Sequence, residues 1–257
     1  MKSQIEIFET GIKDGIMSKN KKFYKENLTQ EEINKIFLET RLKFAKKYNL
    51  NGLHIFQALQ KTPLNKLNYP DGKYIVISEE NMTKEDYWSE KLPADILIIS
   101  NKYKNIIVGN QMSDCPILIA EDRRLGVTAL AHCGASYINR NLPIQTIMAL
   151  ENEYHSNLND IYVYIGSCIK TESYVYDSYP SWATNKEVWK DCIKKEQSIY
   201  KIDLVKAIKK QLKSIGISHI KASKIDTFKD KNYYSHLAEY NGIKEKSGQN
   251  FVGFYYK

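Results

Sequence analysis

Apolar residues recur at helical spacing near the N-terminus and gather into short runs through the middle of the chain. The first pattern follows a capping box made by Thr29 and Glu32, and it predicts a helix from about residue 30 to Tyr48, ending before Asn51 and Gly52. Similar spacing predicts further helices at Leu142 to Tyr154, Asn185 to Tyr200 and Leu204 to Ser214.

Short apolar runs bounded by turn residues predict strands. They are Leu53 to Leu59, Tyr74 to Ser78, Asp95 to Ser100, Asn105 to Gly109, Ile161 to Ile165, His219 to Ala222 and Phe251 to Tyr256. Because the strands cluster in the middle without strict alternation with helices, they predict an α+β fold. No Pro-, Gly- or Ser-rich linker and no repeat interrupts the chain, so we expect a single domain over residues 1–257, a sandwich around a mixed β-sheet.

Two apolar runs in the central segment flank a polar turn, which is the pattern of a β-hairpin. The runs are Pro116 to Ala120 and Val127 to Ala131, and the turn ends at Gly126. A turn centred between residues 123 and 124 predicts that Cys115 lies directly opposite His132, with their Cβ atoms about 5 Å apart.

A thiol and an imidazole at that distance are either two metal ligands or a nucleophile with its base. The alternative is structural: a buried cysteine beside a core histidine, since free cysteine is among the most buried residue types. Cys115 and His132 are therefore the candidate catalytic residues, and Asp114, beside the thiol, is a candidate to orient them.

Composition narrows the class of protein. The chain has 257 residues, of which 42% are hydrophobic and 26% charged, as in soluble globular proteins. Its cysteines form no CxxC or zinc-finger pattern, which fits free thiols in a reducing compartment. The first residues lack the apolar core of a signal peptide, and no apolar stretch approaches the length of a membrane span. We therefore expect a cytoplasmic protein with no membrane partner.

The net charge of +8 comes from 38 basic and 30 acidic residues. Nucleic acid is the first partner that such a charge suggests. However, the lysines are spread along the chain and form no long basic block, zinc finger or known RNA-binding motif. This pattern favours a solvated surface and no nucleic-acid partner, with a positive field that attracts phosphate or an anionic substrate.

Several blocks of the sequence occur in the order known from one family. Ser113 to Ala120 resembles its A-D-C-L-P-V-L-L block, and Gly126 to Gly134 resembles its G-V-V-A-A-A-H-A-G block. Further matching blocks lie at Pro93 to Asn101, Tyr164 to Tyr174 and Asp203 to Gly216. By these blocks the chain resembles the laccase-domain family, also called YfiH-like or polyphenol-oxidase-like, as a divergent member.

The resemblance implies a fold, a metal and a substrate class. Members of the family are similar in having a sandwich around a mixed sheet and one zinc held by two His and one Cys, with an open position for catalysis. The family is associated with phosphorolysis of purine nucleosides, a transferase reaction, and with their hydrolytic deamination. By position, Cys115 and His132 would hold zinc, while Arg41 and Glu172 would lie near a purine nucleoside and phosphate.

The chain departs from the family pattern at the third zinc ligand. The family's Q-V-H-G corresponds to Gln57 to Gln60, so Leu59 replaces the ligating histidine. His54 lies at an odd offset, which on a strand points to the opposite face unless a bulge intervenes. His155, His236, a further cysteine or the substrate are the other candidates. Arginines expected near the substrate are also absent, which removes groups suited to phosphate.

Three functions remain open from the sequence. The first is a purine nucleoside phosphorylase or deaminase with an altered zinc site. The second is a metal-free enzyme of amide or acyl chemistry, with Cys115 as nucleophile, His132 as base and Asp114 or Glu172 orienting it; the fold is similar to that of the deamidating cytotoxic necrotizing factor toxins. The third is a binding protein that has lost the site. A multicopper laccase is not supported, because the chain lacks the histidines for such a cluster.

Overall fold

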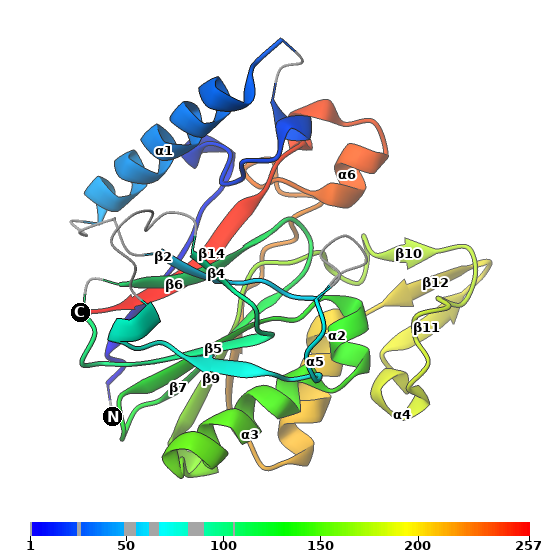
Figure 1. The fold of residues 1–257 in the computed structure, drawn as a ribbon. Coiled ribbons are helices and arrows are strands. Elements are labelled where there is room, and N and C mark those ends of the chain that lie inside the picture. Colours follow the sequence, from blue (N-terminus) through cyan, green and yellow to red (C-terminus); the bar gives the residue numbers. More distant parts are fainter. Residues whose placement is uncertain (1, 25–26, 49–54, 62–66, 82–89, 105) are drawn as a thin grey trace.

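The computed structural model describes residues 2–24, 27–48, 55–61, 67–81, 90–104 and 106–257 (Figure 1). Two mixed sheets lie face to face. The five-stranded sheet has the order β1 (Ile5–Glu9), β14 (Asn250–Tyr256), β6 (Ile107–Met112), β2 (Ile55–Ala58) and β4 (Glu90–Leu92). The six-stranded sheet has the order β13 (His219–Ala222), β9 (Ile161–Ile165), β7 (Ile117–Asp122), β8 (Val127–His132), β5 (Ile96–Ser100) and β3 (Tyr74–Val76).

Helices cover the outer faces of both sheets (Figure 1). The α-helices are α1 (Gln30–Lys47), α2 (Ala135–Asn139), α3 (Leu142–Tyr154), α4 (Lys186–Trp189), α5 (Leu204–Ser214) and α6 (His236–Tyr240). Short 3-10 helices lie at η1 (Ile12–Asp14), η2 (Lys21–Phe23), η3 (Glu79–Asn81), η4 (Leu158–Asp160) and η5 (Lys244–Lys246). A small three-stranded sheet has the order β10 (Val175–Tyr176), β12 (Ile199–Ile202) and β11 (Ile193–Glu196). No helix among the described residues is long and apolar enough to span a bilayer.

The core explains why the central strands read as unbroken apolar runs. Ile117 and Ile119 of β7 pack between the two sheets, against residues such as Val252 of β14. Their neighbours Leu118 and Ala120 point to the other face and pack under α3 and α5. A strand that is buried on both faces needs apolar side chains at every position. On the far side, α1 packs its own apolar face on the five-stranded sheet.

Most predicted elements occur where the sequence places them, and the α+β class with mixed sheets is confirmed. The capping box predicted for α1 is present: Thr29 Oγ1 accepts from the Glu32 amide, and the Glu32 carboxylate accepts from the Thr29 amide at 2.7 Å. The predicted helices α3 and α5 and the strand β9 have the expected bounds. Residues 53–54, at the start of the strand predicted over Leu53 to Leu59, and residue 105, at the start of the strand predicted over Asn105 to Gly109, lie outside the described part of the chain.

The helix predicted over Asn185 to Tyr200 is wrong. Only α4 forms there, and it ends before Asp191, whose φ of 63° is left-handed. A hairpin of β11 and β12 follows, turning at Gln197, which has a φ of 54°. The segment at residues 191–197 is rich in charged residues, so its apolar positions do not distinguish a helix from a strand. Pairing with β12 in the small sheet makes it a strand.

The predicted register of the central hairpin is also wrong. Ile117 pairs with His132, so Cys115 does not lie directly opposite the histidine. The turn is one position later than expected, because Asp122 Oδ1 accepts from the amides of Arg124 and Leu125, each at 2.9 Å, and Gly126 takes a left-handed φ of 66°. A shift of two residues in pairing preserves the face, so the thiol and the imidazole still lie on the same side of the sheet.

Candidate functional site

Cys115 and His132 lie at neighbouring ends of β7 and β8. Cys115 precedes the proline that opens β7, and His132 is the last residue of β8. The thiol lies against Gly134, since a Cβ placed on that glycine would be 3.2 Å from Cys115 Sγ. A side chain at position 134 would crowd the sulfur, so glycine keeps the space that the thiol occupies.

Both side chains line a cavity of about 1100 Å³. Residues 172–177 form one wall, α6 forms another, and Phe23 and Phe228 contribute rings. The cavity brings together four of the residues singled out in the sequence: Cys115, His132, Asp114 and Glu172. Its volume is of the size that holds a small organic ligand.

Burial holds the imidazole and the thiol in their neutral forms. Desolvation lowers the pKa of His132 to about 4, and the buried Nε2 has no hydrogen-bond partner within the described residues. Desolvation also raises the pKa of Cys115 to about 12, with smaller contributions from Asp114 and Cys168. At neutral pH the cavity therefore presents a thiol and an uncharged imidazole.

Asp114 connects three segments around the cavity. Its Oδ1 accepts from Thr227 Oγ1 at 2.7 Å, and its Oδ2 accepts from the Leu237 amide at 2.8 Å in the first turn of α6. Its carbonyl accepts from the Ile169 amide at 3.0 Å. These bonds occupy both carboxylate oxygens, and the structure gives no hydrogen bond between Asp114 and His132. Asp114 therefore positions the walls of the cavity.

The two residues expected near the substrate lie in different places. Glu172 is at the rim of the cavity, where its carboxylate accepts from Lys201 Nζ at 2.6 Å. Hydrogen bonding and charge from Lys201 lower the Glu172 pKa. Arg41 is buried in α1, with its guanidinium 4.3 Å from the ring centre of Phe37 and 5.3 Å from that of Phe251. It does not line the cavity.

The segment after β2 runs beside His132. Gln60 Nε2 donates to the His132 carbonyl at 3.0 Å, which places the preceding Leu59 close to the end of β8. The position that holds a histidine in the family pattern is therefore near the candidate pair, but Leu59 has no donor atom. His54 lies outside the described residues.

The other histidines do not complete a metal site. His155 caps the C-terminus of α3 and does not line the cavity. His236 lines it, but its side chain is 69% exposed and lies 3.8 Å from Glu239. Among the residues that the structure describes, no group of three or more His, Cys, Asp or Glu side chains is placed to hold a metal ion.

An aromatic wall faces the candidate pair. The Tyr174 and Tyr176 hydroxyls lie 3.2 Å apart, and the Tyr174 ring stacks parallel to Trp182 with centroids 6.5 Å apart. Tyrosines two residues apart lie on one face of an extended segment. Trp182 joins them only through the tertiary fold.

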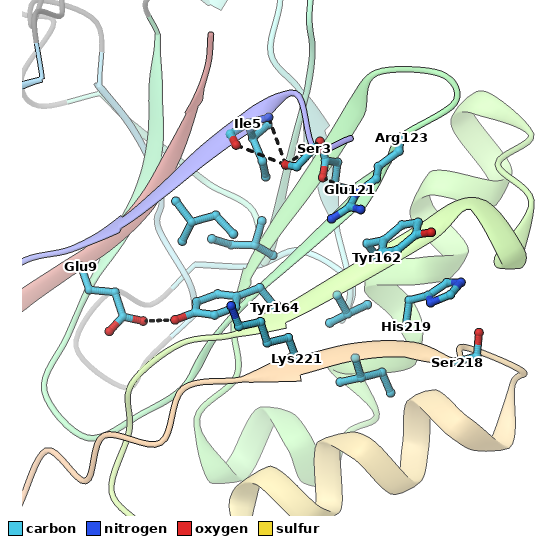
Figure 2. Close-up of a pocket in the computed structure, with 14 residues that line it drawn as sticks. Ser3, Ile5, Glu9, Glu121, Arg123, Tyr162, Tyr164, Ser218, His219 and Lys221 are labelled. Atoms are coloured by element: carbon cyan, nitrogen blue, oxygen red, sulfur yellow. Dashed lines mark hydrogen bonds and ion pairs between the residues drawn. The ribbon is translucent and has the colours of Figure 1, made fainter. Parts of the chain in front are cut away.

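A second groove, of about 720 Å³, is lined by β1 of the five-stranded sheet and by β7, β9 and β13 of the six-stranded sheet (Figure 2). Figure 2 shows the Tyr162 ring between the Arg123 guanidinium, 3.6 Å from the ring centre, and the His219 imidazole, stacked at 4.2 Å. Its carboxylates are already paired: Glu9 accepts from Tyr164 and Glu121 from Arg123. The groove contains neither Cys115 nor His132.

Comparison with known proteins gives a family match and a related protein. Residues 71–251 match the family described as multi-copper polyphenol oxidoreductase laccase. A protein of Clostridium acetobutylicum named purine nucleoside phosphorylase is 31% identical over 151 residues, which cover 56% of this chain and 60% of that protein. The match thus spans less than two thirds of the relative's length.

Solved structures share the fold at low identity. YfiH of Bacillus licheniformis superposes with a TM-score of 0.68 and 16% identity, covering 86% of this chain and 81% of that one. YlmD of Geobacillus stearothermophilus superposes with a TM-score of 0.65 and 16% identity, covering 86% of this chain and 80% of that one. At this identity the likeness establishes the fold alone.

Proposed function

Since this chain belongs to the family described as multi-copper polyphenol oxidoreductase laccase, we propose that it is an enzyme that cleaves purine nucleosides in the cavity around Cys115 and His132. The name of the Clostridium acetobutylicum relative supports this substrate class. The volume of the cavity and its aromatic wall suit a purine ring joined to a sugar.

One observation carries the proposal. The His132 Nε2 is buried at the cavity and has no partner within the described residues, while other polar groups nearby, such as the Asp114 carboxylate, are hydrogen-bonded. An unpaired buried nitrogen costs stability unless a ligand satisfies it. It is therefore the group that a bound substrate would satisfy.

The described donors do not complete a zinc site. Cys115 and His132 supply one sulfur and one nitrogen, and Leu59 stands where the family pattern has the third ligand. A catalytic zinc is held by three protein ligands. The described residues therefore do not fit the zinc centre that the family resemblance implies.

The side chains suggest how the glycosidic bond is broken. Attack by phosphate or water at the anomeric carbon breaks its bond to the purine nitrogen, and the purine departs with the bonding electrons. As a neutral imidazole, His132 would donate a hydrogen bond from Nε2 to the departing base, which stabilises the developing negative charge. The Tyr174 and Tyr176 rings, which form the aromatic wall, would pack against the base. Asp114 would hold α6 in place at the cavity through its bond to the Leu237 amide.

The thiol-nucleophile hypothesis fits the site less well. A catalytic cysteine needs a depressed pKa, usually from a protonated histidine beside it. Burial here raises the pKa of Cys115 and lowers that of His132, so both groups are held away from the thiolate–imidazolium state. We therefore favour nucleoside chemistry over amide or acyl transfer.

The test is release of free base from adenosine, inosine and guanosine by the full chain, measured by chromatography with and without phosphate. We expect base release that His132→Ala slows by about a hundredfold, with His219→Ala, in the second groove, as the matched histidine control. A requirement for phosphate would indicate a phosphorylase, and release without it a hydrolase. No release of base from any nucleoside, with or without phosphate and added zinc, would overturn the proposal.

Metal content of the same samples sharpens the result. Mass spectrometry of the parent chain and of Cys115→Ala would show whether the thiol holds zinc, with Cys192→Ala as the matched cysteine control. About one zinc per chain that is lost only in Cys115→Ala would mean that Cys115 is a zinc ligand and that further ligands complete the site. Activity without bound zinc would support the side-chain mechanism.

A further inference from the structure

Four lysines of α5 and two from distant segments of the sequence surround one hollow of the surface. The hollow measures about 870 Å³ and lies between α5, the loop at residues 170–171 and residues 222–224. Its lysines are Lys170, Lys206, Lys209, Lys210, Lys213 and Lys224. Asp203 is the single carboxylate of the lining, and it caps α5 by accepting from the Lys206 amide at 2.8 Å.

The positive charge of the hollow is not neutralised nearby. Within the described part of the chain, none of the six lysines forms an ion pair. The ammonium groups of Lys206 and Lys210 donate to backbone carbonyls of residues 187–191, which carry no formal charge. For Lys209, Lys213 and Lys224 the described residues provide no hydrogen-bond or ion-pair partner. These three amines are available to an incoming anion.

The helix sets the spacing of the charges. The apolar face of α5 is buried against the core through residues such as Ile208 and Leu212, so its lysines all lie on the outer face. Lys206, Lys209 or Lys210, and Lys213 follow each other along one stripe of the helix. At 1.5 Å of rise per residue, their steps are about 5 Å.

We propose that this lysine-rich hollow binds the sugar–phosphate backbone of single-stranded nucleic acid. A row of amines that faces a single carboxylate, Asp203, gains most from a ligand that carries a row of phosphates. An anionic membrane fits less well, because a helix that binds the bilayer surface exposes an apolar face, and that of α5 is buried in the core. The lining has no aromatic ring to stack on bases, so its contacts would go to the sugar–phosphate backbone, which carries no sequence information.

The hollow is separate from the proposed active site, although the two share a wall. Residues 170–171 line the hollow, and residues 172–177, which follow directly, line the cavity of Cys115 and His132. The binding inference does not depend on nucleoside cleavage.

The experiment is fluorescence anisotropy of a labelled single-stranded oligonucleotide of about 12 nucleotides, titrated with the full chain at about 50 mM salt. The test variant is Lys209→Glu with Lys213→Glu. The matched control is Lys43→Glu with Lys46→Glu, which makes the same charge change on the exposed face of α1. We expect the test variant to bind at least tenfold more weakly than the control, and the salt slope to fall by about 1.4 for two lost phosphate contacts.

Other outcomes would overturn the inference. Equal weakening by both double variants would mean that net charge alone drives binding. No binding by the parent chain at low salt would exclude a nucleic-acid site. Binding to vesicles rich in phosphatidylserine but not to the oligonucleotide would assign the hollow to a membrane. Circular dichroism and thermal unfolding confirm that each variant is folded, and Lys224→Glu provides an independent variant outside α5.

Discussion

The cavity of Cys115 and His132 and the lysine-rich hollow lie on two sides of the segment at residues 169–177, yet they are built in opposite ways. In the cavity, burial keeps the imidazole and the thiol neutral. In the hollow, six lysine ammonium groups lack carboxylate partners within the described residues. The first arrangement suits a neutral, ring-shaped ligand, and the second suits a chain of phosphates.

The difference explains where phosphate would act on this molecule. The cavity lining contains Lys22 but no arginine, whereas six lysines line the neighbouring hollow. The groups suited to phosphate are thus beside the cavity rather than in it. A phosphorylase would have to hold phosphate with few charged groups, so the phosphate dependence of base release becomes the most informative property of the proposed enzyme.

The largest expected effect comes from restoring a metal donor to the cavity. Leu59→His places an imidazole next to the end of β8, where Gln60 already contacts the His132 carbonyl. Each protein ligand of a structural zinc contributes about 3 kcal/mol, so we expect zinc affinity to rise at least about a hundredfold. Equilibrium dialysis measures it, with Leu92→His, which pairs with the Leu59 segment, as control. Equal zinc binding by both variants would show that position 59 does not face the pair.

Removing the cavity's unpaired nitrogen should have a comparable effect on activity. With His132→Ala we expect kcat/KM for nucleoside cleavage to fall by about a hundredfold, because a hydrogen bond to the departing base is lost. Steady-state kinetics of base release give the value. If His132→Ala keeps full activity, the leaving base is stabilised elsewhere and the proposed role of His132 is wrong.

Asp114→Ala should be the most destabilising change in the cavity wall. It leaves Thr227 Oγ1 and the Leu237 amide without their acceptor, and hydrogen bonds to a charged group contribute about 1.5–3 kcal/mol each. We expect the free energy of unfolding to fall by about 3 kcal/mol in urea titrations. Asp177→Ala, an exposed carboxylate of the same cavity, should change it by less than about 0.5 kcal/mol. Similar values for the two variants would contradict the positioning role.

A smaller effect is expected from pH. The folded-state pKa of His132, about 4, is below the ordinary value of 6.5. As the pH falls through 6.5, the unfolded chain binds a proton that the folded chain does not, so stability declines until about pH 4. We expect His132→Gln to remove about 2 kcal/mol of the difference in stability between pH 7 and pH 5. The matched control His219→Gln makes the same substitution at an exposed histidine. An identical pH dependence in all three proteins would mean that His132 titrates normally.

The apolar pattern of the sequence predicted correctly the helices and strands that bury one face in the main core. Apolar periodicity placed α3, α5 and β9 correctly, because each buries a face against the same core. It failed between α4 and β12, where charged residues line a small exposed sheet and left-handed residues decide the turns. The candidate pair was found because Cys115 and His132 lie on a short hairpin, although the register was misjudged by two residues.

By itself, the sequence determined the fold class, the central hairpin and the thiol–imidazole pair, since these depend on neighbours along the chain. The tertiary structure alone decided that Asp114 holds the walls of the cavity and that Arg41 is away from it. It also brought Lys170 and Lys224 beside the four lysines of α5, around one hollow, on a chain whose sequence favoured no nucleic-acid partner. Charge acts through space, so the approach of distant segments to a helix is not visible in the local pattern of that helix.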